Sequence, residues 1–104
     1  MKTQHSNTAD MMRSNASKAE ALLKQLANRN RLMVLCALAS GEKTVSELLE
    51  MLDLSQSALS QHLAKMRDAG LVASEKRGQM VYYSIQGMEV NAILSTLYLL
   101  YCRK

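Results

Sequence analysis

The sequence predicts a single, mainly α-helical domain that carries one small β-hairpin. The chain has 104 residues, and its 8 Met and absence of Pro favour helices. Apolar residues recur with the helical period of about 3.6 over most of the chain. After Gly70 the period changes, and two β-prone runs follow on either side of a Gly-Gln pair.

Two helices are predicted in the first part of the chain. Residues 1–14 are polar, and we expect them to form a flexible segment ahead of a domain at residues 15–104. A stripe of Met, Ala and Leu places the first helix at roughly 12–27. The second helix, at residues 31–39, is apolar on almost every side and should lie in the centre of the core.

A short helix and a longer helix follow in the pattern of a helix-turn-helix. Thr44 and Glu47 match a capping box, and they open a short helix that runs to about Leu52. A tight connection then leads into a longer helix, which Ser55 caps and Gly70 stops. In DNA-binding proteins the second helix of such a unit enters the major groove, although helical hairpins of other kinds share the arrangement.

The longer helix has two different faces. Leu59, Leu63 and Met66 form its apolar stripe, whereas the opposite face carries hydroxyl, amide and cationic groups. Such groups bond base edges and phosphates, so we predict a DNA-recognition helix; on this segment alone, an ordinary amphipathic surface helix is the alternative. His62 lies at the edge of the apolar stripe, and we expect it to pack against the protein or to contact backbone phosphate. The predicted DNA-binding residues here are Ser55, Gln56, Ser57, Ser60, Gln61, His62 and Lys65.

The two β-prone runs predict a hairpin directly after this helix. They cover residues 71–77 and 80–85, with Gly78 in the turn between them. A basic tip at this place is typical of a wing, whose cations reach backbone phosphate beside the groove. The alternative is a solvated turn whose charge is incidental. The predicted DNA-binding residues of the wing are Lys76, Arg77 and Gln79.

The last segment, from Met88 to about Cys102, is long enough for a helix, and apolar side chains cover nearly its whole circumference. The last helix of a small domain cannot bury so many apolar side chains in its own core, and an exposed patch of this kind usually marks an interface. We therefore predict a homodimer in which this helix and the first one pack across a two-fold axis. The two recognition helices would then lie about 34 Å apart on pseudo-palindromic DNA.

The charge and the N-terminus bear on the cellular context. The formal net charge of +4 is compatible with a nucleic-acid partner. The N-terminus lacks the apolar core of a secretory signal, and no apolar run is long enough to span a bilayer. We expect a cytoplasmic protein without a membrane partner. Its two cysteines should be thiols there, so that a bridge between them would be regulatory.

The order of these elements and three segments within them resemble the ArsR family of winged-helix repressors, also called the SmtB/ArsR family. The segments are Leu54–Leu63, Met66–Val72 and Val81–Ile85, and the resemblance covers nearly the whole chain from about residue 16. It implies a winged helix-turn-helix with the order α-α-α-α-β-β-α. It also implies a homodimeric transcriptional regulator, a repressor, that binds double-stranded operator DNA.

Many members of this family sense metals, through sites that this sequence lacks. One site places a Cys-x-Cys motif in the third helix, but residues 44–52 contain no Cys or His. Another places Asp and His on the last helix, but residues 88–104 contain neither. A transition-metal site needs several converging N or S ligands. We therefore predict no metal site and no cofactor.

Two cysteines remain, Cys36 and Cys102. Taken singly, Cys36 is interpreted as a small core residue and Cys102 as an unremarkable terminal thiol. Together, residues 35–38 and 101–102 resemble the persulfide-responsive branch of the family that includes BigR, SqrR, YgaV and HlyU. In that branch the matching cysteines form a dithiol sensor of reactive sulfur species. The resemblance implies that Cys36 attacks, that Cys102 links to it through a disulfide or polysulfide, and that DNA affinity falls.

Other functions compete with this redox-responsive repressor. A metal-responsive repressor of the same fold would need ligands from Cys36, Cys102, His5 or a carboxylate. A regulator similar to HlyU would activate transcription by displacing another DNA-bound protein. A small thiol enzyme has little support, because the chain has no Cys-x-x-Cys motif and no His beside either Cys. We therefore predict no catalytic residues.

Overall fold

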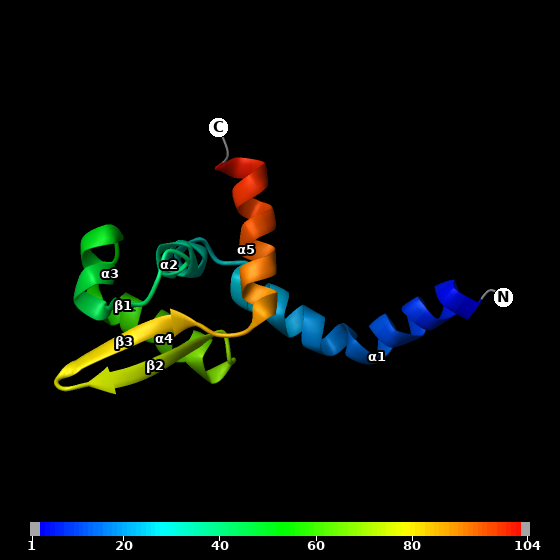
Figure 1. The fold of residues 1–104 in the computed structure, drawn as a ribbon, viewed down its shortest axis with the longest axis horizontal. Helices are drawn as coiled ribbons and strands as arrows, with labels where there is room; N and C mark the ends of the chain where they lie inside the picture. Colours follow the sequence, from blue (N-terminus) through cyan, green and yellow to red (C-terminus); the bar gives the residue numbers. More distant parts are fainter. Residues whose placement is uncertain (1–2, 103–104) are drawn as a thin grey trace.

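The computed structural model describes residues 3–102, with the side chains of residues 8–102. This part of the chain forms five helices and a three-stranded sheet (Figure 1). The helices are α1 (Thr3–Leu26), α2 (Arg29–Leu38), α3 (Val45–Met51), α4 (Gln56–Asp68) and α5 (Met88–Tyr101). The strands are β1 (Lys43–Thr44), β2 (Val72–Arg77) and β3 (Met80–Ile85). The predicted fold class, helical with a small β-hairpin, is confirmed.

The core is built around α2, as its all-round apolar sequence predicted. Val34 and Leu35 of this helix have no exposed surface. They belong to one cluster with the apolar stripe of α4, which the sequence assigned correctly to Leu59, Leu63 and Met66. Because α2 and α4 share this cluster, the helix with the polar outer face is held firmly against the centre of the domain.

Side-chain caps set the starts of the helices. The Thr44 hydroxyl accepts a hydrogen bond from the Glu47 amide at 3.2 Å, and the Glu47 carboxylate accepts one from the Thr44 amide at 2.8 Å. The predicted capping box of α3 is thus confirmed. The Ser55 hydroxyl caps α4 by accepting from the Ala58 amide at 3.1 Å. Asn28 caps α2 in the same way, which starts that helix two residues earlier than predicted.

The hairpin is present, but the sheet has a third strand that the sequence analysis missed. The strand order is β1-β3-β2, and all neighbours are antiparallel. Gly78 has a φ of 62°, as the first central residue of a tight type II′ turn requires, and Arg77 pairs with Met80 across it. The additional strand β1 is two residues long, which is too short to show a period of two.

The first helix is longer than predicted. α1 begins at Thr3 rather than near residue 12, and its N-terminal part points away from the rest of the described chain (Figure 1). Local bonds support its exposed part, such as the ion pair of 2.6 Å between Arg13 and Asp10. The flexibility of residues 1–14 stays a prediction, because a helical conformation does not exclude fraying, and residues 1–2 lie outside the described part. No helix within residues 3–102 is long and apolar enough to cross a membrane.

Replacing Leu63 by alanine tests the packing of α4 on the core. Leu63 is 1% exposed, so Leu63→Ala should lower the free energy of unfolding by about 2–5 kcal/mol, as lost burial and a cavity combine. Urea denaturation followed by circular dichroism measures this change. Ser60→Ala, an exposed substitution on the same helix, is the control and should change the free energy by less than about 0.5 kcal/mol. Equal effects of the two substitutions would contradict the assigned packing.

Candidate nucleic-acid interface and thiol pair

The polar face of α4 is open to solvent. Its predicted DNA-binding residues are all exposed apart from the half-buried His62: Ser55, Gln56, Ser57, Ser60, Gln61 and Lys65. The first turn of α4 contains no acidic residue, and its last turn carries Lys65 and Arg67. The hydroxyl groups of Ser55 and Ser57 lie 3.4 Å apart at the N-terminus of the helix. This end therefore presents hydroxyls and amides to an incoming ligand.

His62 lies at the boundary between this polar face and the core. Its Nδ1 atom is buried and has no hydrogen-bond partner among the described residues. Burial lowers the pKa of His62, and the charges of Arg31 on α2 and Lys65 on α4 lower it further. The imidazole therefore loses its proton more readily than a free histidine side chain does.

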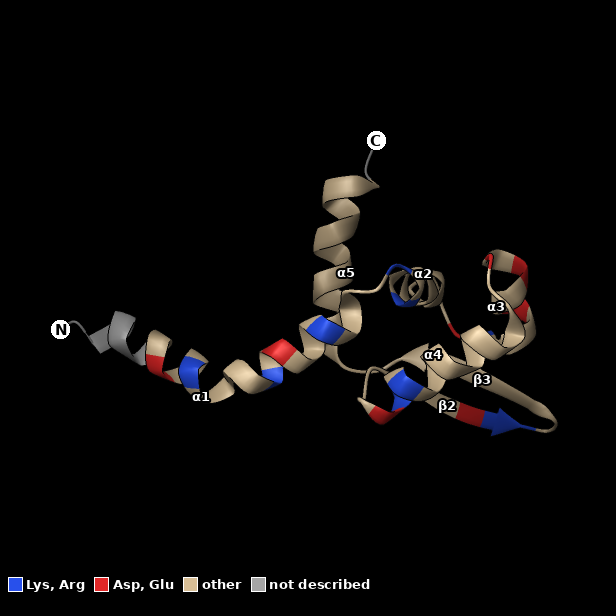
Figure 2. Ribbon diagram, turned by 180° about the vertical axis from the view of Figure 1, so that it is seen from behind, with Lys and Arg blue, Asp and Glu red and all other residues tan. Residues whose placement is uncertain are grey.

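The wing carries its cations at the end of β2, and one of them is already paired (Figure 2). Lys76, Arg77 and Gln79 are exposed, as predicted. The Arg77 guanidinium, however, donates to Glu42 at 2.6 and 2.8 Å and to Glu75 at 2.7 Å. The contact with Glu42 could not be predicted from the sequence, because Glu42 lies 35 residues from Arg77 along the chain.

Both cysteines are exposed free thiols, one on α2 and one at the C-terminal cap of α5. Cys36 is exposed, so its interpretation as a core residue is wrong: α2 buries Val34, Leu35, Ala37 and Leu38 and turns Cys36 outwards. Cys102 is also exposed, at the C-terminal cap of α5. Partial burial raises the pKa of Cys36, and charge repulsion from Cys102 raises it further.

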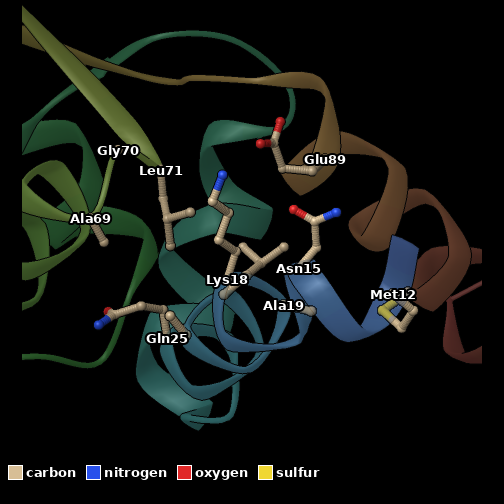
Figure 3. Close-up of a pocket in the computed structure, with 11 residues that line it drawn as sticks. Met12, Asn15, Lys18, Ala19, Gln25, Ala69, Gly70, Leu71 and Glu89 are labelled. Carbon is tan, nitrogen blue, oxygen red and sulfur yellow. The ribbon is translucent and has the colours of Figure 1, made fainter. Parts of the chain in front are cut away.

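A cavity of about 520 Å³ lies elsewhere, between α1 and the start of β2 and α5 (Figure 3). Asn15 and Lys18 of α1 line one side of it, and Leu71 and Glu89 line the other. Neither cysteine contributes to its wall. Within the described residues, no group of three or more His, Cys, Asp or Glu side chains is placed to hold a metal ion. The side chain of His5 lies outside the described part.

The sequence and the fold match those of known bacterial regulators. A family model described as "Bacterial regulatory protein, arsR family" matches residues 22–74, which include α2, α3, α4 and the start of β2. The chain belongs to the ArsR family. It is also 49% identical over 92 residues to the transcriptional activator HlyU of Vibrio cholerae, a match that covers 88% of this chain and 85% of the relative. The protein is thus a DNA-binding transcriptional regulator and not an enzyme.

Solved structures show the same fold in regulators of one branch of this family. HlyU from Vibrio vulnificus matches with a TM-score of 0.84 at 48% identity, over 91% of this chain and 99% of that one. The transcriptional repressor BigR from Xylella fastidiosa matches with a TM-score of 0.85 at 29% identity, over 92% and 98%. The resemblance to this ArsR branch is thereby confirmed.

The charge repulsion between the thiols gives a testable pH dependence. Cys102→Ser removes a neighbouring negative charge, so the pKa of Cys36 should fall and its alkylation should begin at lower pH. Iodoacetamide labelling of Cys36, followed by mass spectrometry across the pH range, measures the midpoint. Thr96→Ala, which lies elsewhere on α5, is the control and should leave the midpoint unchanged. A midpoint that is the same with and without Cys102 would show that the two thiols do not interact.

Proposed function

We propose that this protein is a homodimeric repressor whose affinity for operator DNA falls when Cys36 and Cys102 become linked. The observation that carries the proposal is that a chain of the ArsR family has two exposed free thiols, Cys36 on α2 and Cys102 at the C-terminal cap of α5. Reactive sulfur species are the proposed inducer, and general thiol oxidation has the same result. The regulator would act in the cytoplasm, where bacterial DNA is located and thiols stay reduced.

DNA contact is assigned to the polar face of α4 and to the wing. Amides such as Gln61 reach base edges from the major groove, whereas Lys65 and Lys76 bind phosphates. Both cations are exposed, and neither forms an ion pair within the residues that the structure describes. The remaining proposed contacts are Ser55, Gln56, Ser57, Ser60, His62 and Gln79. Arg77 was also predicted to bind DNA, but its guanidinium is already bonded to Glu42 and Glu75.

Dimerisation through α1 and α5 is supported by the shape and surface of one chain. The radius of gyration is 16.2 Å, whereas a compact chain of this length has about 13 Å. Glu89 in the first turn is the only charged residue of α5, and the rest of the helix carries no charge (Figure 2). Large exposed apolar side chains of the two helices are Met11, Met12, Leu23, Met88, Tyr98, Leu99, Leu100 and Tyr101. A second copy of the chain would cover this surface.

The sulfur chemistry needs only the two thiols and a persulfide. The Cys36 thiolate attacks the sulfane sulfur of a persulfide RSSH, and RSH leaves as Cys36 becomes a persulfide. The Cys102 thiolate then attacks the Cys36 sulfur and expels hydrosulfide, which leaves a disulfide between the two residues. The protein loses two electrons and the sulfane sulfur is reduced. A longer sulfur bridge forms if Cys102 is itself persulfidated first.

A second candidate function is activation of transcription, in which this regulator displaces another DNA-bound protein. It is favoured by the similarity to HlyU, a protein named as a transcriptional activator. The same DNA and thiol sites would serve it. A reporter gene fused to the target promoter distinguishes the outputs, because deletion of a repressor raises expression whereas deletion of such an activator lowers it.

Gln61→Ala tests base recognition. The loss of a base contact should weaken binding to operator DNA by about 1–3 kcal/mol and leave binding to random duplex nearly unchanged. Fluorescence anisotropy with both duplexes measures the difference. Gln86→Ala makes the same chemical change at an exposed position outside α4 and should have no effect. An equal loss on both duplexes would show that Gln61 does not read a base.

Lys76→Ala tests the phosphate contact of the wing. Affinity should fall on every DNA sequence, and the slope of log affinity against log salt should become shallower by about one unit. Titration at several salt concentrations measures the slope. Lys24→Ala, on α1 and paired with Glu20, is the control for loss of one positive charge. An unchanged slope in the Lys76 variant would remove this contact from the interface.

Cys36→Ser and Cys102→Ser test the switch itself. Both variants should bind operator DNA as the reduced wild type does, since neither cysteine is on α4 or in the wing. After treatment with a persulfide donor, only the wild type should release DNA. Gel shift before and after treatment measures this response. If the Cys36 variant still released DNA, a dithiol switch would be excluded.

A further inference from the structure

We propose that Arg77 is a positioning residue that fastens the wing to the loop after α2, and that this link carries changes at Cys36 to the wing. The first half concerns the fold alone. The second half rests on the proposed function, because it assumes that the thiols respond to sulfur species.

Arg77 is held from three sides at the tip of the wing. Its guanidinium donates to both oxygens of Glu42, at 2.6 and 2.8 Å, and to Glu75 at 2.7 Å. It also lies 4.7 Å from the ring centre of Tyr82. Single surface ion pairs contribute little, but a two-pronged arginine–carboxylate contact stacked on an aromatic ring has a defined geometry. This cluster fixes the direction in which Arg77 points.

Only one of these contacts joins the wing to another part of the molecule. Glu75 is on the same strand as Arg77, and Tyr82 is on the paired strand β3. Glu42, in contrast, lies between α2 and β1. Strand β1 reinforces the same junction, because Thr44 pairs with Tyr82. Residues 42–44 thus hold the wing through a side chain and through the sheet.

The loop that carries Glu42 is bonded in turn to the last turn of α2. The Ala39 amide donates to the carbonyl of Cys36 at 3.2 Å. The Ser40 hydroxyl donates to the Ala37 carbonyl at 3.2 Å, and the Lys43 ammonium donates to that hydroxyl at 3.2 Å. A displacement of the last turn of α2 therefore moves Glu42. Since Glu42 holds Arg77, such a displacement also reorients the wing.

The cluster gives the two basic residues of the wing different roles. The hydrogen bond from Arg77 lowers the pKa of Glu42, so this ion pair stays charged at physiological pH. Lys76 points to the other face of β2, because side chains alternate along a strand. A phosphate that approached Arg77 would meet two carboxylates, whereas Lys76 is free of them. Lys76 is thus the phosphate contact, and Arg77 sets its position.

Paired alanine variants test the link with matched charge. Glu42→Ala and Glu75→Ala each remove one negative charge beside Arg77, but only Glu42 joins the wing to the α2 loop. Arg77→Lys keeps the net charge and loses the two-pronged contact. Hydrogen exchange of amides in β2 and β3 reports how firmly the wing is held. The ratio of DNA affinities between the reduced and the Cys36–Cys102-linked protein reports the coupling.

We expect Glu42→Ala and Arg77→Lys to speed hydrogen exchange in the hairpin by about fivefold. Each variant should also lower the ratio of DNA affinities between reduced and linked protein to less than half of the wild-type ratio. Glu75→Ala should leave both within about twofold of wild type. Equal exchange in the two alanine variants would overturn the link. Faster exchange with an unchanged ratio would overturn the coupling alone. Equal affinity of reduced and linked wild type would overturn the sulfur switch, and hydrogen exchange would still decide whether Arg77 fastens the wing.

Discussion

Burial of α2 is the constraint on which the rest of the structure depends. Val34 and Leu35 are completely enclosed, and the stripe of α4 packs into the same core. This packing fixes α4 with its hydroxyls, amides and lysine outwards, as DNA recognition requires. The same helix turns Cys36 to solvent and leads directly into the loop that holds the wing. One buried helix therefore carries the thiol and supports both candidate DNA-binding elements.

In the proposed switch, this arrangement would connect the two thiols to DNA binding. A bridge between Cys36 and Cys102 would tie α2 to α5, and α5 belongs to the proposed dimer interface. Tightly packed interiors move as units and do not deform continuously, so a shift of α2 would reach α4 through the core. It would reach the wing through Glu42 and Arg77. Both routes begin on the same helix, so in the proposed switch the position of α2 would set DNA affinity.

Much of this could be predicted from sequence where the determining interactions are local. The Thr44 capping box, the Ser55 cap and the α4 stripe depend on residues three or four apart, and all three were predicted correctly. The missed features depend on distant partners. β1 is a strand only because it pairs with Tyr82 and Tyr83 of β3. Glu42 binds Arg77, which lies 35 residues further along the chain. Cys36 was wrongly predicted to be a core residue. Because α2 is apolar on almost every side, no periodicity in its sequence marks the face that is exposed to solvent.

The most direct test is intact-protein mass spectrometry of the reduced wild type before and after a persulfide donor, paired with a gel shift on operator DNA from the same sample. We expect the mass of one chain to fall by two hydrogens, or to change by that loss plus whole sulfur atoms, and the DNA to be released. An unchanged mass, or a modified protein that still holds its DNA, would contradict a switch built on Cys36 and Cys102.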